Sequence, residues 1–158
     1  MADGLTWYFA YGSNMDQVRL FDQRLAPRGV PRGERVAGRL RDWRLVFDKP
    51  ARLLKGAAAA NLVPAEGEVV HGTLNALPDA GFDVLDIYEG VADRQYERRT
   101  IRVVRGDTGE EVEAIVYVAL LQGEGLKPQR AYLDCLLASR DLLPPDYWER
   151  LAATPTVD

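Results

Sequence analysis

One acidic side chain near the middle of the sequence, Glu89, has the surroundings expected of a general base. The apolar spacing predicts a helix over residues 79–89, and at about 100° per residue Phe82, Leu85 and Glu89 share its apolar face. Gly90 follows directly and is a natural helix end. Partial burial and the negative end of the helix dipole both raise the pKa of such a carboxylate toward neutral pH, where a proton carrier is most useful. The pattern leaves open the alternative that Glu89 frays from the last turn into solvent.

A second candidate is the turn formed by Tyr11, Gly12, Ser13 and Asn14. It follows the apolar run 7–11, which predicts a strand buried on both faces, and it precedes residues 15–24, which we expect to be helical. Backbone N–H groups at the start of a helix lack helical partners, so this turn can bind a carboxylate or phosphate, and Gly12 allows close approach. The alternative is a plain strand-to-helix turn capped by Ser13 or Asn14. A phosphate-binding motif of the form GxxxxGK[ST] does not occur.

The other reactive side chains predict neither a nucleophile nor a metal site. His71 is the only histidine, and strand alternation places it with Thr73 and Asn75 on a polar, solvent-facing side, so we expect no Ser-His-Asp triad. Cys135 is the only cysteine, which excludes an internal disulfide and a cysteine-based zinc site; we expect it to be a small core residue. No cluster of potential metal ligands stands out, so we expect no metal.

The composition is that of an ordinary globular protein: 47% of the residues are hydrophobic and 28% are charged. The net charge is −4 and the pI is about 5.1, without a basic stripe, so we expect no nucleic-acid partner. The basic and apolar stretch 49–55 is interpreted as a solvated loop. No apolar run approaches the roughly 20 residues that span a bilayer, and no signal peptide is visible. With a single cysteine, these features predict a cytoplasmic protein without a membrane partner.

The elements that must position the two candidates suggest an α+β fold in one domain over residues 1–158. Alternating or continuous apolar runs predict strands at 7–11, 43–47, 58–63, 69–77, 100–105 and 111–120. Helical spacing and prolines predict helices at 15–24, 79–89 and 128–140, and a short one after 144–145. Most links are short and show no regular strand-helix-strand alternation, so the sheet should be mainly antiparallel and barrel-like, with flanking helices.

Two motifs resemble the signatures of one family, the γ-glutamylcyclotransferase or AIG2-like family. Residues Tyr8 to Met15, with the sequence YFAYGSNM, resemble its N-terminal signature, and Leu85 to Val91, with LDIYEGV, resemble the segment that carries its catalytic glutamate. The stretches between and after them also fit the family in order: 38–47, 61–64, 70–74, Tyr96, 127–132 and 143–151. The resemblance spans about residues 7 to 151 without a large gap, and the order of the two motifs is highly specific.

The resemblance implies a small mixed barrel with a central cavity and a cyclising cleavage of an amide. The α-amino group of a γ-glutamyl substrate would attack its own γ-carbonyl, giving 5-oxoproline and a free amine or amino acid. Glu89 would accept the ammonium proton as base and return it to the leaving nitrogen as acid. The loop Tyr11 to Asn14 would hold the glutamyl head with its α-carboxylate, and Tyr96 and Tyr132 would line the pocket and hydrogen-bond the substrate. No cofactor is implied, because the substrate contains its own nucleophile.

Two alternatives stay open. The same chemistry could act on glutathione or on a γ-glutamyl-protected amine of a biosynthetic pathway, because the loops that select the leaving group are not readable from sequence. A non-catalytic small-molecule-binding domain could also keep the cavity, although the presence of Glu89 argues against it. The sequence does not determine the physiological substrate, the pathway, the oligomeric state, or whether a lid closes over the site.

Overall fold

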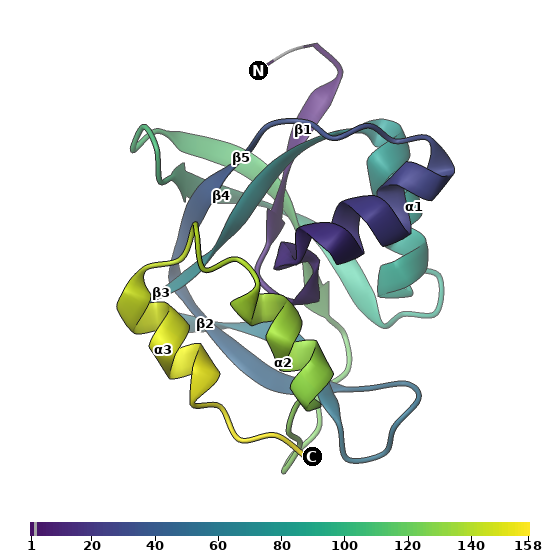
Figure 1. Cartoon of the computed structure of the whole chain (residues 1–158), viewed down its shortest axis with the longest axis vertical. Helices are drawn as coiled ribbons and strands as arrows, with labels where there is room; N and C mark the ends of the chain where they lie inside the picture. Colours follow the sequence, from purple (N-terminus) through teal and green to yellow (C-terminus); the bar gives the residue numbers. More distant parts are fainter. Residues whose placement is uncertain (2) are drawn as a thin grey trace.

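Five strands close into a barrel in the order β1-β3-β2-β4-β5, in a computed structural model that describes residue 1 and residues 3–158 (Figure 1). The strands are β1 (Leu5–Ala10), β2 (Arg35–Pro50), β3 (Ala58–Pro78), β4 (Tyr96–Arg105) and β5 (Glu111–Ala119). β1 and β5 pair in parallel, whereas the other neighbours pair antiparallel. The predicted fold class, a mixed and mainly antiparallel barrel with flanking helices, is therefore confirmed.

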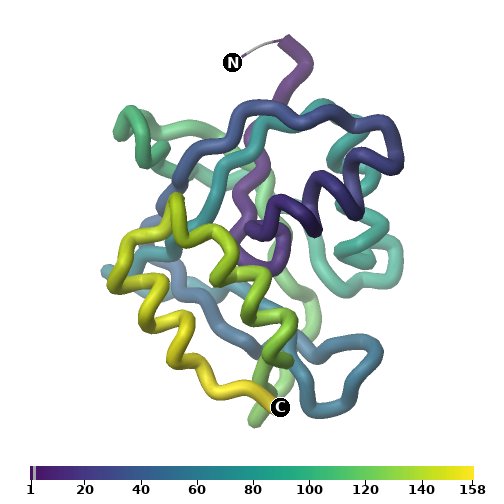
Figure 2. Tube along the Cα trace, in the orientation of Figure 1, coloured from purple at the N-terminus to yellow at the C-terminus, as the bar shows by residue number. Residues whose placement is uncertain are grey.

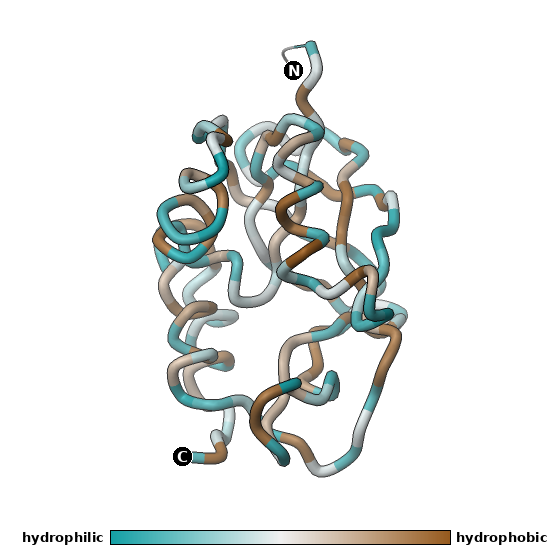
Figure 3. Tube along the Cα trace, turned by 90° about the vertical axis from the view of Figure 1, so that its right-hand side faces the viewer, coloured by the Kyte–Doolittle hydropathy of each residue, from teal (hydrophilic) through white to brown (hydrophobic). Residues whose placement is uncertain are grey.

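Helical segments flank this barrel. They are the 3₁₀ turn η1 (Ser13–Met15), the π-helix η2 (Val18–Leu25), the 3₁₀ turn η3 (Ala26–Arg28), α1 (Asp79–Glu89), α2 (Arg130–Leu137) and α3 (Pro145–Ala152). In Figure 2, α2 and α3 lie side by side and η2 lies beside α1, and each pair is in contact. Hydrophobic and hydrophilic residues alternate along the helical turns (Figure 3), so each helix has an apolar side to bury. None of the helices among the described residues is long and apolar enough to cross a membrane.

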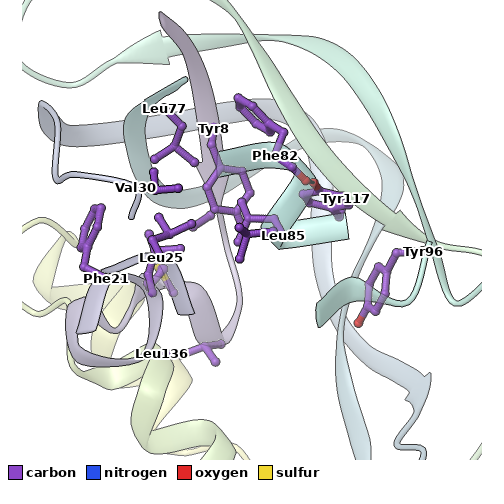
Figure 4. Close-up of a cluster of buried hydrophobic side chains, with 14 of the residues drawn as sticks. Tyr8, Phe21, Leu25, Val30, Leu77, Phe82, Leu85, Tyr96, Tyr117 and Leu136 are labelled. Atoms are coloured by element: carbon purple, nitrogen blue, oxygen red, sulfur yellow. Dashed lines mark hydrogen bonds between the residues drawn. The ribbon is translucent and has the colours of Figure 1, made fainter. Parts of the chain in front are cut away.

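Strand β1 is buried on both faces, as its apolar sequence predicts. Trp7 and Phe9 belong to a core cluster drawn from all five strands, which fills the barrel. Tyr8 belongs to a second cluster, between the barrel and the helices. Figure 4 shows Tyr8 among side chains such as Leu25 of η2 and Leu85 of α1. The alternation along β1 thus connects the barrel interior to the helical layer, and the chain leaves β1 at the turn that was predicted to bind substrate.

Strands β2 and β3 are longer and more continuous than the sequence predicts. β2 begins at Arg35, well before the strand predicted at 43–47, and β3 runs through Pro64, directly after the strand predicted at 58–63. Pro64 pairs with Trp43 beside a register shift, next to Asp42 with φ of 67°. Proline cannot donate a hydrogen bond to the ladder, but a bulge tolerates it. The bulge therefore lets one long strand form where two were expected.

The predicted helix over residues 15–24 is present in a different form. The chain makes a 3₁₀ turn at Ser13–Met15 and then the π-helix η2, which has a wider turn than an α-helix. Ser13 lies within the 3₁₀ turn, and no side chain caps it; Asp16 instead accepts a hydrogen bond from the backbone N–H of Val18 at 3.0 Å. Leu20 and Phe21 of η2 are still buried, so the apolar side of the segment is as predicted.

The expectation of a solvent-facing side around His71 is wrong. Thr73 and Asn75 are fully buried, because this side of β3 belongs to the interior of the fold. Asn75 donates from Nδ2 to Thr73 Oγ1 at 3.1 Å, whereas its Oδ1 is buried without a hydrogen-bond partner among the described residues. His71 is half-buried and packs edge-on against Tyr147 of α3, with ring centroids 4.9 Å apart. Cys135 is also half-buried, so it is only partly a core residue.

Candidate active site

A cavity of about 610 Å³ opens between the turn after β1 and the end of α1. All seven residues predicted to form a site line it: Tyr11, Gly12, Ser13, Asn14, Glu89, Tyr96 and Tyr132. They come from segments far apart in the sequence, namely the turn, the last residue of α1, the first residue of β4, and α2. The barrel and its helices therefore bring together a set of residues that the sequence could only suggest.

Glu89 is the last residue of α1, and its position is fixed by the way that helix ends. Gly90 adopts the left-handed conformation with φ of 65° and donates its N–H to the carbonyls of Asp86 and Ile87. Leu85 and Phe82 on the same face are buried, as the helical spacing predicts. Glu89 does not fray into solvent: it is partly buried, with its carboxylate turned to the cavity wall.

Asn14 connects Glu89 to the loop through a short hydrogen-bond network. Its Nδ2 donates to Tyr8 Oη at 3.0 Å and lies 3.4 Å from Glu89 Oε1. On the other side of the amide, Asn14 Oδ1 accepts a hydrogen bond from Arg24 Nη1 at 2.7 Å. The guanidinium of Arg24 also stacks on the ring of Tyr88, 4.5 Å from its centroid. Because a guanidinium can only donate, Arg24 forces the oxygen of the amide toward itself and the NH₂ group toward Glu89.

Burial raises the pKa of Glu89 from its ordinary 4.5 to about 7. The positive charges of Arg24, Arg19 and Lys49 oppose this rise but do not cancel it. Glu89 is the only acidic side chain that lines the cavity within the described residues. A carboxyl group with a pKa near 7 is divided between its two protonation states at neutral pH, so it can both accept and donate a proton.

Three of the six tyrosines that line the cavity, Tyr11, Tyr96 and Tyr132, were predicted to form the site, and burial raises the pKa of each of these hydroxyls. The pKa of Tyr132 rises to about 12, and those of Tyr11 and Tyr96 rise well above 10, so all three are neutral at pH 7. Tyr11 donates to the carbonyl of Tyr117 at 2.5 Å and Tyr96 donates to the carbonyl of Ala60 at 2.7 Å. Their protons are engaged, so toward a ligand both hydroxyls act as acceptors.

Tyr132 differs from the other two tyrosines. Its hydroxyl oxygen accepts a hydrogen bond from the backbone N–H of Ala60 at 2.8 Å. The hydroxyl proton therefore remains available to a ligand. Of the two tyrosines that the resemblance implied as substrate donors, the geometry suits Tyr132 for donation and Tyr96 for acceptance.

The backbone of the loop supplies further donors. Among the hydrogen bonds of the described residues, none has the N–H of Gly12, Ser13 or Asn14 as donor. The loop also lies close to the opposite wall: a Cβ on Gly12 would be 3.2 Å from the Cβ of Ala60 and 3.3 Å from Tyr132 Oη. Glycine at this position therefore lets the loop lie against the wall, and the N–H groups of residues 12–14 have no acceptor among the described residues.

Sequence reasoning missed several charged and polar residues of the cavity: Tyr8, Arg19, Arg24, Lys49 and Gln95. Lys49 was placed in a solvated loop, but it is only 3% exposed, and its Nζ donates to Gln95 Oε1 at 2.5 Å and to the Pro50 carbonyl at 2.7 Å. Burial lowers its pKa. Arg19 carried a signal, because it lies four residues after Met15 and so shares an apolar helical side. No pattern in the sequence marked Lys49.

Within residues 1 and 3–158, no group of three or more His, Cys, Asp or Glu side chains is placed to hold a metal ion.

Comparison with known protein families gives one match. The sequence profile of a family described as the AIG2-like family matches residues 69–151. Comparison with curated proteins gives no match.

Solved structures show the same fold. An uncharacterised protein from Homo sapiens is 24% identical, with a TM-score of 0.84, and the match covers 99% of this chain and 91% of that one. A γ-glutamyl cyclotransferase is 23% identical, with a TM-score of 0.83 and coverage of 98% and 90%. A γ-glutamyl cyclotransferase from yeast that is specific to glutathione is 12% identical, with a TM-score of 0.64 and coverage of 94% of both chains. At these identities the likeness establishes the fold.

Proposed function

The chain belongs to the AIG2-like family, and from the cavity we propose that it is a γ-glutamylcyclotransferase that converts a γ-glutamyl amino acid or amine to 5-oxoproline and the free amine. One observation carries the proposal. Glu89, with a pKa near 7, is the sole acidic lining residue of the described cavity, and it faces a loop with unpaired N–H donors. Two of the similar structures are γ-glutamyl cyclotransferases, which supports the same reaction class.

Glu89 has the protonation behaviour that cyclisation requires. As a carboxylate it accepts a proton from the α-ammonium group, which frees the lone pair of the nitrogen. The nitrogen then attacks the γ-carbonyl carbon of the same molecule, and the new C–N bond closes a five-membered ring. The protonated Glu89 returns this proton to the leaving nitrogen as the original amide bond breaks. The regenerated carboxylate then takes the second proton of the ring nitrogen, and the released amine carries this proton away as an ammonium ion. With a pKa near 7, the same side chain can perform both steps.

The main task of the enzyme in this reaction is to orient the substrate, because the nucleophile and the electrophile are in one molecule. The substrate must be folded so that its amine approaches its own carbonyl. The loop Tyr11 to Asn14 would hold the glutamyl head through its free N–H groups, and Asn14 would place Glu89 beside the amine. Tyr132 Oη has a free proton for an oxygen of the substrate, including the oxyanion that develops at the γ-carbon.

The cavity also has a side suited to the leaving group. Arg52, Leu53 and Leu54, from the connection between β2 and β3, line its open edge, and Leu53 is fully exposed. An amino-acid leaving group has both a carboxylate and a side chain to place on such an edge. This supports γ-glutamyl amino acids as substrates, with glutathione and γ-glutamyl amines as the comparisons to make.

A screen for 5-oxoproline release tests the proposal. The panel contains γ-glutamyl amino acids, a γ-glutamyl amine and glutathione, and at least one compound should be turned over. Glu89→Gln keeps the shape but removes proton transfer, so it should lower kcat by roughly 10²–10⁴-fold with the fold unchanged. Asp83→Asn is the matched control, because Asp83 lies on the same helix with a side chain that is 82% exposed.

Two results would contradict the proposal. Turnover by Glu89→Gln within a few-fold of the parent would remove Glu89 from the reaction. An absence of 5-oxoproline across the whole panel would leave a small-molecule-binding domain as the better description of the chain.

A further inference from the structure

Arg19, in the first turn of η2, lines the cavity without an oxygen partner. Its Nε is inaccessible to solvent and has no hydrogen-bond acceptor among the described residues. Its Nη1 contacts only the thiol of Cys135, with 3.7 Å between Nη1 and Sγ. A thiol is a weak acceptor, so this contact compensates little of the guanidinium charge.

The other cationic side chains of the cavity have oxygen partners. Arg24 donates to Asn14 Oδ1, Lys49 donates to Gln95 Oε1, and Arg52 forms an ion pair with Asp93 at 2.7 Å. No salt bridge of Arg19 is found within the described residues. A half-buried cation without a partner lowers stability unless an anion occupies the site. The arrangement around Arg19 is therefore that of a site for a negatively charged group of a ligand.

The position of Arg19 indicates which group this is. It lines the cavity together with Ser13, Gln129 and Tyr132, and its contact with Cys135 places it against α2, the helix that carries Tyr132. Its charge also acts on Tyr132 and Glu89, lowering the pKa of both, so it lies within electrostatic reach of the proton carrier. The edge suited to the leaving group is formed by a different segment, the β2–β3 connection.

We infer that Arg19 is a specificity-determining residue that forms an ion pair with the α-carboxylate of the γ-glutamyl group. The inference rests on the proposed function. The α-amine and the α-carboxylate share one carbon, so a substrate whose amine faces Glu89 must hold its carboxylate close by. The loop N–H groups and Tyr132 Oη supply hydrogen bonds at this place, and Arg19 supplies the full positive charge that they lack. The pair would fix the head group with its amine toward Glu89.

The experiment pairs a change in the enzyme with a change in the substrate. The values of kcat/KM are measured for a γ-glutamyl amino acid and for its α-carboxamide, which keeps the amine and the γ-amide but loses the negative charge. The parent should prefer the carboxylate by roughly 10- to 100-fold, the range expected for a charged hydrogen-bonded pair. Arg19→Gln should abolish most of this preference by slowing the carboxylate substrate alone. Arg19→Lys should retain part of it, and Arg32→Gln, which changes an exposed arginine outside the cavity that pairs with Asp22, should retain it fully.

Binding provides a readout that does not depend on turnover. In a Glu89→Gln background, calorimetry should show that Arg19→Gln weakens binding of the carboxylate compound and leaves that of the carboxamide unchanged. An equal loss for both compounds, or an unchanged preference, would overturn the role of Arg19. If the parent releases no 5-oxoproline but shows this difference in binding, the proposed reaction fails and the anion site stands. If turnover is normal and the difference is absent, the anion site fails and the reaction stands.

Discussion

The amide of Asn14 faces the carboxylate of Glu89, with 3.4 Å between Nδ2 and Oε1, although 75 residues separate them in the sequence. The contact depends on Arg24, which donates to the amide oxygen of Asn14 and so determines which way the amide points. Arg24 therefore acts on the orientation of the Glu89 carboxylate indirectly, through its hydrogen bond to Asn14.

Arg24→Gln tests this arrangement. The variant loses the fixed donor to Asn14, and it also removes a positive charge that lowers the pKa of Glu89. We expect kcat to fall roughly 10-fold, as for a misplaced catalytic group. The acidic limb of the pH profile of kcat/KM should also move to higher pH. Arg32→Gln is the control, because Arg32 is exposed and pairs with Asp22 at the surface. A fall in kcat without a shift of the acidic limb would assign Arg24 a structural role only.

The pH dependence of the parent follows from the raised pKa of Glu89. The carboxylate form accepts the proton, so kcat/KM should fall as pH decreases below about 7, approaching tenfold per unit. At the alkaline end the substrate ammonium loses its proton to solvent, so Glu89 has no proton to pass to the leaving nitrogen and the profile should fall again. A bell-shaped profile of 5-oxoproline release against pH is the expected result. A flat rate between pH 5 and 7 would contradict Glu89 as the base.

Glu89 should lower the stability of the protein at neutral pH. Its folded-state pKa of about 7 lies above the ordinary 4.5, so between these values the folded state binds more protons than the unfolded state. The contribution of Glu89 to the free energy of unfolding is therefore most favourable below pH 4.5, and it declines as the pH rises to 7. At about 1.4 kcal/mol per pKa unit, the total cost is about 3 kcal/mol.

Glu89→Gln removes this cost, so the variant should be more stable than the parent at pH 8 and similar to it at pH 4. For a chain of this size, a gain of about 3 kcal/mol corresponds to a Tm increase of roughly 6–12 °C. Thermal unfolding of both proteins across this pH range measures the difference. Asp83→Asn, on the exposed side of α1, should show no such pH-dependent gain. A Tm difference that is the same at pH 4 and pH 8 would contradict the raised pKa.

The sequence predicted those parts of the site whose placement follows from local periodicity. Glu89 lies on the apolar side of α1 because Phe82 and Leu85 recur at helical spacing, and packing of that side turns the carboxylate inward. The turn at Gly12 follows because the apolar run before it can only be a buried strand. In both cases the nearest residues in sequence determine which way the side chain points.

The remaining site residues depend on contacts between distant segments. The buried ammonium group of Lys49 donates to Gln95, directly before β4, and nothing in the sequence near position 49 indicates this partner. Arg24 is held by Asn14, and the π-helical turn between them shifts the register that an α-helix would impose. Thr73 appeared to face solvent because alternation distinguishes the two faces of a strand without showing what covers each. The burial and the partners of Lys49, Arg24 and Thr73 therefore depend on tertiary packing.

Gly12→Ala tests whether the loop must lie against the barrel wall. The new methyl group would be 3.2 Å from the Cβ of Ala60 and 3.3 Å from Tyr132 Oη, and the loop or Tyr132 must move by a few tenths of an ångström. We expect kcat/KM for the preferred γ-glutamyl substrate to fall roughly 10- to 100-fold, because small displacements of positioning groups have large effects on rate.

Gly81→Ala is the matched control. A Cβ at Gly81 is also 3.2 Å from its nearest neighbour, the Cβ of Leu77, but it lies in α1 away from the cavity. Its turnover should remain within about twofold of the parent, with no loss of stability greater than about 1 kcal/mol, since alanine favours a helix over glycine by a similar amount. If both variants lost activity equally, crowding anywhere in the fold would account for the effect. A selective loss at Gly12 would show that the close approach of the loop to Tyr132 and Ala60 is needed for the reaction.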